Sequence, residues 1–200
     1  MKITKINALF ISLILVFSLT IIGCGKAKEE LKEDNKEEVK EDHELEFTNG
    51  TRTFKSEVTP LTESQKVILH SLKIEISDKY DEFADLYVDN PYFNYYPKSY
   101  KYKFGQGLYC EEITINSIKR LTEDEYLKEC EDVKVYQNID RLKEYNPHEF
   151  EIIEVNYTIK LTDKYNKIAQ FGDGDWIRYY VMVKEKEDCS WKIFEIYGYM

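Results

Sequence analysis

The sequence predicts an α+β domain whose N-terminal helices pack on one face of a curved antiparallel sheet. Two observations support this class. Residues 62–89 carry apolar side chains at helical spacing, and residues 153–199 read as three long strands joined by short links. Consecutive strands with short links form an antiparallel meander, which a preceding set of helices covers on one face.

The composition sets limits on the class of protein. Of the 200 residues, 42% are hydrophobic, which is enough for a packed core and excludes wholesale disorder. With only 8 glycines and 4 prolines, collagen-like and proline-rich architectures are excluded. The formal net charge is −10, so we expect no nucleic-acid partner, because phosphate binding needs clustered Lys and Arg.

The first 23 residues have the organisation of a secretory signal. Lys2 and Lys5 precede an uncharged, mostly apolar run over residues 8–22, and Gly23 and Cys24 follow directly. A membrane-spanning helix needs ~20 apolar residues, so this run is short for a span. A basic start, a short apolar stretch and a small residue before a break are typical of a signal peptide.

The sequence Ile21-Ile22-Gly23-Cys24 resembles the bacterial lipobox. The resemblance implies cleavage after Gly23 and a diacylglyceryl thioether on Cys24. Two or more acyl chains, at ~0.8 kcal/mol per buried CH₂, hold a protein on a bilayer. The alternative is an uncleaved anchor helix in which Cys24 has no role. Both predict a partner membrane and a chain that lies on the extracytoplasmic face of the cell membrane.

Residues 24–53 are expected to be a flexible acidic tether that starts at the lipidated Cys24. Residues 26–46 hold five Lys and ten acidic residues, with almost no apolar side chain to dock them. The folded α+β domain is then expected over residues 54–200. The preference of the whole chain for Lys over Arg, 24 to 4, is usual in AT-rich genomes and suggests a low-GC Gram-positive source.

Residues 62–89 are expected to be helical. Thr62 and Gln65 form a capping box, and Asn90-Pro91 ends the segment. A break near Ser77-Asp78, which would give two helices, fits the pattern as well. One apolar stripe at spacings of three and four comprises Leu69, Leu72, Ile76, Tyr80, Phe83 and Tyr87.

Residues 92–109 are rich in aromatic side chains and have turn signals but no clear period. We expect a loop there, with at most one short strand. Tyrosine suits recognition because it is large, stiff and amphipathic. The loop is therefore the best candidate contact surface, with Tyr95, Tyr96 and Tyr100 as candidate binding residues.

The remaining elements follow in order along the chain. A strand is expected over residues 112–120, a short helix from a capping box at Thr122 and Glu125 to Cys130, and a helix over residues 137–145. The C-terminal meander has strands at residues 153–161, 176–187 and 191–199. A long hairpin loop spans residues 163–175, where Gly172 and Gly174 favour a turn over a calcium loop.

The C-terminal strand Trp191-Lys192-Ile193-Phe194-Glu195-Ile196-Tyr197-Gly198-Tyr199 gives the domain a family resemblance. With the helices first, the order is similar to the cystatin-like, nuclear-transport-factor-2-like domains of many Gram-positive lipoproteins. The resemblance implies a strongly curved sheet wrapped around the helices and a cone-shaped cavity between them. It implies no reaction, because that fold hosts isomerases, dehydratases and binding modules.

The sequence shows no catalytic motif. The three His residues lie far apart in the sequence, and no phosphate-binding, dinucleotide-binding or nucleophile-elbow pattern occurs. Cys110, Cys130 and Cys189 form no C-x-x-C pair, and whether two of them form a disulfide stays open. We therefore expect no enzyme, no catalytic residue, no metal site and no cofactor.

The strand over residues 176–187 carries the last candidate site. Trp176, Arg178 and Tyr180 share one face, and the other face is apolar. The face with Arg178 either lines a cavity for an anion or polar ligand, or is an outer face on which Arg178 stacks on tyrosine. Sequence alone favours the outer face.

These observations together predict a membrane-anchored lipoprotein that binds a small ligand or another protein. A small cavity enzyme of isomerase or hydrolase type, and a subunit of an envelope complex, are the alternatives. A closed, polar cavity with a carboxylate or His of raised or lowered pKa would favour the enzyme, and an exposed aromatic patch over a filled core would favour binding.

Overall fold

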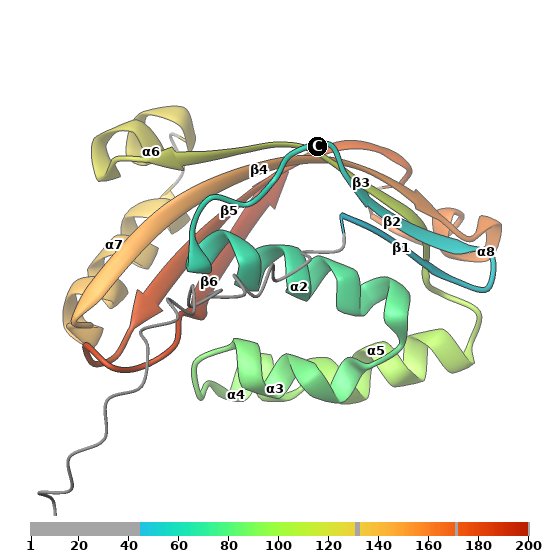
Figure 1. The fold of residues 1–200 in the computed structure, drawn as a ribbon, viewed down its shortest axis with the longest axis horizontal. Coiled ribbons are helices and arrows are strands. Elements are labelled where there is room, and N and C mark those ends of the chain that lie inside the picture. The colour runs from blue at the N-terminus through green and yellow to red at the C-terminus, as the bar shows by residue number, and fades with distance from the viewer. Residues whose placement is uncertain (1–44, 131–132, 171, 200) are drawn as a thin grey trace, which may run out of the picture. The chain divides into compact units, whose positions relative to one another are not determined.

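The computed structural model describes residues 45–130, 133–170 and 172–199 (Figure 1). Six strands form one sheet in sequence order, and every neighbouring pair is antiparallel except β2–β3, which is parallel. The α+β class and the C-terminal antiparallel meander are thereby confirmed. The strands are β1 (Glu46–Asn49), β2 (Arg52–Ser56), β3 (Cys110–Leu121), β4 (Glu149–Leu161), β5 (Gly174–Lys184) and β6 (Lys192–Tyr199).

The helices lie in two groups. The first group fills the crossover between the parallel strands β2 and β3, and α2 lies between the sheet and the layer formed by α3, α4 and α5 (Figure 1). The second group, α6 and α7, lies at one end of the sheet, and the short helix α8 lies at the opposite end (Figure 1). The helices are α2 (Glu63–Ser77), the 3₁₀ turn η1 (Tyr80–Glu82), α3 (Phe83–Leu86), α4 (Pro91–Asn94), α5 (Tyr96–Gly105), α6 (Glu123–Cys130), α7 (Val133–Tyr145) and α8 (Asp163–Asn166).

Helix α2 begins and ends where its sequence signals lie. The Thr62 side chain accepts a hydrogen bond from the Gln65 backbone N–H at the N-terminus. Asp78 adopts a left-handed conformation, with φ of 66°, and ends the helix. The break near Ser77-Asp78 is therefore confirmed. Because α2 lies between two layers, it is buried on more than one side, including Ile68 and Ile74.

The expectation of a loop over residues 92–109 is wrong, because this segment forms most of α4 and all of α5. The Asn90 side chain caps α4 by accepting from the Tyr92 N–H. Pro91 and Pro97 lie in the first turns of the two helices, where a missing N–H costs nothing. The prolines that resembled turn signals in the sequence are therefore helix starts.

The sheet also begins earlier than expected. Strands β1 and β2 form a hairpin with Asn49 paired to Arg52 across a two-residue loop, in which Gly50 has φ of +64°. Glycine adopts this backbone conformation without steric cost, which a two-residue hairpin requires. The expected domain start at residue 54 lies inside β2. Residues 46–53, predicted as part of the tether, belong to the sheet.

The other predicted elements lie close to their expected places. The second capping box is confirmed, since the Thr122 N–H donates to Glu125 Oε2 at 2.7 Å and the Glu125 N–H donates to Thr122 Oγ1 at 3.2 Å. The loop expected over residues 163–175 contains the short helix α8 and then leads into β5. No helix in the described ranges is long and apolar enough to cross a membrane. The predicted signal peptide and Cys24 lie outside the described residues.

Candidate functional site

Arg178 of β5 lies on the sheet face that the helices cover. In the β4–β5 register, Arg178 pairs with Val155 and Tyr180 pairs with Ile153, so these four side chains share one face. Val155 and Ile153 are fully buried there. The favoured prediction of an outer face for Arg178 is therefore wrong. The alternation of side chains within β5 does not show which face lies against α2, because both faces of this strand are covered.

The guanidinium of Arg178 is enclosed by an acid and two aromatic rings. Its Nη1 lies 3.6 Å from Oε1 of Glu75 on α2, and the two side chains are 23% and 16% exposed. The guanidinium carbon lies 5.0 Å from the centre of the Tyr157 ring and 5.9 Å from that of Trp176. Burial disfavours the charge, but Tyr157, Tyr180 and Glu75 raise the pKa of Arg178 well above its usual value, so it remains a cation.

The neighbouring strand leaves room for this side chain. Gly198 of β6 pairs with Arg178 across the β5–β6 ladder. A Cβ atom at position 198 would lie 2.8 Å from Arg178 Cγ and 2.7 Å from the Ile177 carbonyl oxygen. Glycine at 198 is therefore required for Arg178 to hold its inward conformation beside this strand.

Two cavities meet at Arg178. One, of about 110 Å³, lies towards Tyr157 and Trp176, and the other, of about 190 Å³, lies towards Tyr96 and Tyr180. The side chains common to both linings are Glu75, Tyr100 and Arg178. Since a water molecule takes up about 30 Å³ in the liquid, each cavity is large enough for a small molecule.

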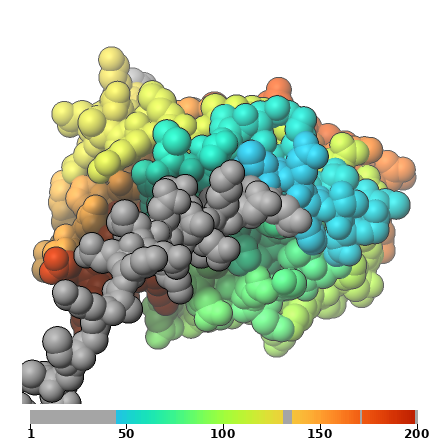
Figure 2. Space-filling view, viewed as in Figure 1, coloured from blue at the N-terminus to red at the C-terminus, as the bar shows by residue number. Residues whose placement is uncertain are grey.

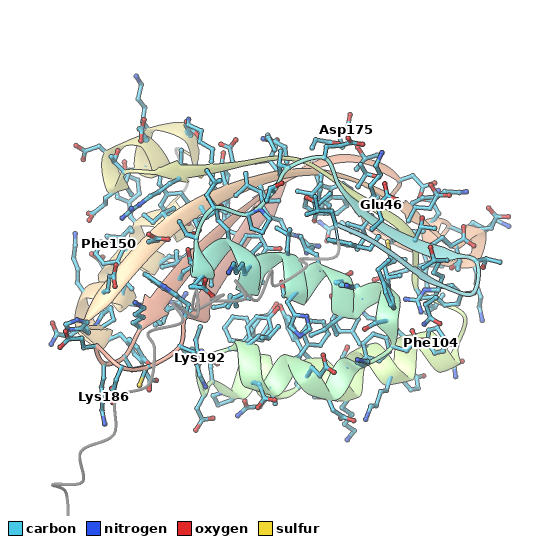
Figure 3. The ribbon with its side chains drawn as sticks, viewed as in Figure 1. Glu46, Phe104, Phe150, Asp175, Lys186 and Lys192 are labelled. Atoms are coloured by element: carbon cyan, nitrogen blue, oxygen red, sulfur yellow. The ribbon has the colours of Figure 1, made fainter. Side chains whose placement is uncertain are left out.

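Aromatic side chains of α3–α5 close these cavities from the side opposite the sheet. Phe83 contacts Tyr96 and Tyr100, with ring centres 6.1 Å and 5.0 Å apart. Figure 3 shows the side chains that fill the space between α2 and α5, with Phe104 at the end of α5 near the β1–β2 hairpin. In the space-filling view, the side chains of α3–α5 (green) adjoin those of this hairpin (Figure 2), and Arg52 contacts Phe104.

The tyrosines around the cavities are held in the neutral form. Burial raises the pKa of Tyr100 and Tyr157 well above the usual tyrosine range, and it also raises that of Tyr96. Burial likewise raises the pKa of Tyr180, although hydrogen bonding to Arg178 opposes the shift. At neutral pH these phenols therefore offer hydroxyl groups as hydrogen-bond donors and acceptors.

These shifts predict how the protein responds to alkali. An acid whose pKa is raised in the folded state loses its proton more readily when unfolded, so stability falls as the pH rises above ~10, the unfolded tyrosine value. Tyr80, whose pKa burial raises to about 12, contributes to this loss. We expect phenolate absorbance to rise in two stages, the second coinciding with the loss of circular dichroism. A single stage near pH ~10 with the fold intact would contradict it.

Five of the six predicted binding residues come together around this site. Arg178, Tyr180 and Trp176 of β5 and Tyr96 and Tyr100 of α5 line the two cavities. Tyr95 does not join them. It is 59% exposed and lines an outer groove of about 490 Å³ over α4 and α5, whose inner wall is formed by Tyr92, Tyr96 and Tyr100. The Tyr side chains of α4–α5 thus separate the outer groove from the inner cavities.

Two residues that enclose the Arg178 guanidinium were not found from the sequence. Glu75 lies between the buried Ile74 and Ile76 of α2, and an acid among apolar helix positions is the signal that could have identified it. Tyr157 was recognised only as a strand residue. Its place opposite Trp176 depends on the β4–β5 register, which the sequence does not show.

A larger, more open groove of about 800 Å³ lies between α7 and β6. The arginine that lines it already has partners, because Arg141 bonds to Glu195 and donates to Asn138 Oδ1 at 2.8 Å. Within the described ranges no group of three or more His, Cys, Asp or Glu side chains is placed to hold a metal ion. Cys110 and Cys189 are free thiols, and burial raises the pKa of Cys110, so it is protonated.

No match was found among models of known protein families, curated proteins or solved structures. We therefore infer the function from the residues of the cavities and from the sequence of the N-terminus.

Proposed function

We propose that this protein is a lipid-anchored binding protein of the cell surface, which holds a small polar ligand between its sheet and its helices. The observation that carries the proposal is the placement of a charged pair, Arg178 and Glu75, at the junction of two interior cavities.

The cost of that pair supports a role in binding. Removing two charges from water costs several kcal/mol per ion in real proteins, and apolar residues of similar volume stabilise a fold equally well or better. At 3.6 Å, the contact is also longer than a good hydrogen bond. Unfilled volume beside a costly and loosely paired guanidinium is expected where a ligand completes the contacts.

The protonation state of the tyrosines that line the cavities favours binding over catalysis. Burial raises the pKa of Tyr96, Tyr100 and Tyr157, so at neutral pH these phenols stay protonated and are not poised to release or accept a proton. They are suited to orient a ligand through hydrogen bonds. A cavity enzyme would need a base or acid poised near neutral pH.

The cystatin-like, nuclear-transport-factor-2-like resemblance remains part of this proposal. Helix α2 lying against the sheet, the C-terminal meander of β4–β6 and cavities between the layers are in accord with it. Most modules of this kind bind rather than catalyse, which agrees with the proposed role.

The direct test uses a panel of small carboxylates, amines, amino acids and sugars in thermal-shift measurements on the purified full chain. We expect at least one class to raise the melting temperature of the native protein and not that of Arg178→Gln. Arg141→Gln, at an exposed ion pair on α7, is the matched control and should respond like the native protein. An equal response of Arg178→Gln, or no response of the native protein, would contradict ligand binding at this site.

The lipid anchor is tested separately at Cys24. In a bacterial host that acylates lipoproteins, Cys24→Ser is expected to abolish labelling with radioactive palmitate and to leave a longer precursor. Serine lacks the thiol that carries the thioether. Cys189→Ser is the control and should keep both the label and the processing. Continued labelling of Cys24→Ser would refute acylation at this residue.

A further inference from the structure

Tyr157, whose side chain lines the cavity of about 110 Å³, has a hydroxyl group that is buried and without a hydrogen-bond partner. Tyr157 is 1% exposed, and its hydroxyl oxygen has no protein partner within the described residues. An unsatisfied buried polar group costs about 1–3 kcal/mol, and such groups are few in native proteins. The hydroxyl oxygen has less than 1 Å² of accessible surface, so it reaches a polar atom in that cavity only when the Tyr157 side chain turns towards it.

The Arg178 guanidinium, which lines the same cavity, has hydrogen-bond donors to spare. A guanidinium has five N–H donors, and its contacts here are a 3.6 Å approach to Glu75, a hydrogen bond to Tyr180 and two aromatic faces. A carboxylate is the group that best fills the remaining fork of donors. The Tyr157 ring lies against this guanidinium, so a carboxylate bound to Arg178 lies close to the Tyr157 side chain.

Glu75 restricts which carboxylate fits. A simple anion beside Arg178 would meet the negative charge of Glu75, which like-charge repulsion disfavours. A ligand that also carries an ammonium group replaces this repulsion with attraction. The lining of both cavities by Glu75 and Arg178 thus matches a molecule with one positive and one negative end.

Size limits the ligand further. The cavities, at about 110 Å³ and 190 Å³, are below the ~300–1,000 Å³ of sites that hold drug-sized molecules. We propose that the site takes a small zwitterion, an α-amino acid, with its carboxylate towards Arg178 and Tyr157 and its ammonium towards Glu75. This inference rests on the proposed function and names the ligand class for the same cavity.

Calorimetric titration of the full chain, purified in detergent, tests this directly. The probes are the common α-amino acids and, for the tightest of them, the matching carboxylic acid without the amino group and the matching amine without the carboxylate. We expect the amino acid to bind, and each analogue to bind at least ~10-fold more weakly, because each leaves one charge of the site unpaired.

Two variants and one control variant test where the ligand binds. Tyr157→Phe is expected to weaken binding of the amino acid by about 3- to 10-fold, the effect of one lost hydrogen bond, and Glu75→Gln by at least ~10-fold. Tyr126→Phe removes a hydroxyl from a tyrosine equally buried on α6, outside both cavities, and should leave binding unchanged. Because Tyr157→Phe removes only one buried oxygen, it tests the site even if a charge variant fails to fold.

Each outcome separates this inference from the function on which it rests. Binding of the carboxylic acid as tightly as the amino acid would overturn the zwitterion and keep a ligand site at Arg178. Equal binding to the native protein and to Tyr157→Phe would show that the ligand does not bind in this cavity. No binding of any amino acid, with another class of the small-molecule panel active, would overturn this inference alone. No binding of any compound in the panel would overturn both this inference and the proposed function.

Discussion

Replacing Arg52 with alanine is expected to destabilise the protein by about 3–5 kcal/mol, the usual cost of removing one partner of a buried charged network. Arg52 is 5% exposed and bonds to the Asp78 carboxylate and to the Glu75 and Cys110 carbonyl oxygens. Its guanidinium also lies against the rings of Phe104 and Tyr109. One side chain therefore joins β2 to α2, α5 and the start of β3.

Chemical denaturation of the full chain measures this effect as a change in the free energy of unfolding. Arg141→Ala is the matched control, because Arg141 also forms an ion pair but is 50% exposed, and it should cost less than about 1 kcal/mol. Arg52→Lys should lose most of the stability as well, since an ammonium does not reproduce the fork of donors. A small effect of Arg52→Ala would show that the β1–β2 hairpin is not integral to the domain.

Phe83→Ala is expected to destabilise the protein by about 3–5 kcal/mol, as for other buried aromatic residues. Phe83 is 1% exposed and lies at the centre of the aromatic layer. Its ring centre is within 6.4 Å of those of four neighbours, Tyr80, Tyr87, Tyr96 and Tyr100. The truncation leaves a void behind the tyrosines that close the cavities, so we expect ligand binding to weaken as well.

Thermal or chemical unfolding measures the effect. The control is Tyr102→Ala on the same helical layer, where the ring is 69% exposed, and the expected change is within about 0.5 kcal/mol. An equal cost for the two substitutions would contradict the assignment of Phe83 to the core of this layer.

Elements with a strong local signal were predictable from the sequence. Residues 153–161 alternate apolar and polar side chains, and β4 buries Ile153, Val155 and Tyr157 on one face as that period requires. Helix ends marked by side-chain caps, such as Thr62 and Thr122, were also placed within a residue or two, because the cap satisfies specific backbone N–H groups.

Elements whose signals were mixed were not predictable. Asn90-Pro91 predicts the end of a helix, but proline also favours the first turn of one, and Pro91 and Pro97 both lie in first turns. The β1–β2 hairpin follows directly on a charged segment, and its short strands hold only a few apolar side chains. Gly50-Thr51 was the available signal, since glycine is common at the first position of a two-residue hairpin loop.

The site itself depends on relationships between distant parts of the chain. Glu75 and Arg178 lie more than one hundred residues apart in the sequence, and their proximity follows from α2 packing across β5. Alternation along β5 identifies which residues share a face but not which face lies against α2. The face is set by the pairing of Arg178 with Val155, which is a long-range contact between two strands.

The most direct test of a ligand site between the sheet and the helices is a crystal structure of the protein soaked with the tightest compound of the panel. Electron density for the compound is predicted in contact with Arg178, Glu75 and the Tyr157 hydroxyl group. Cavities that remain filled by water or by tyrosine side chains, with the compound bound only in the outer groove beside Tyr95, would contradict the account.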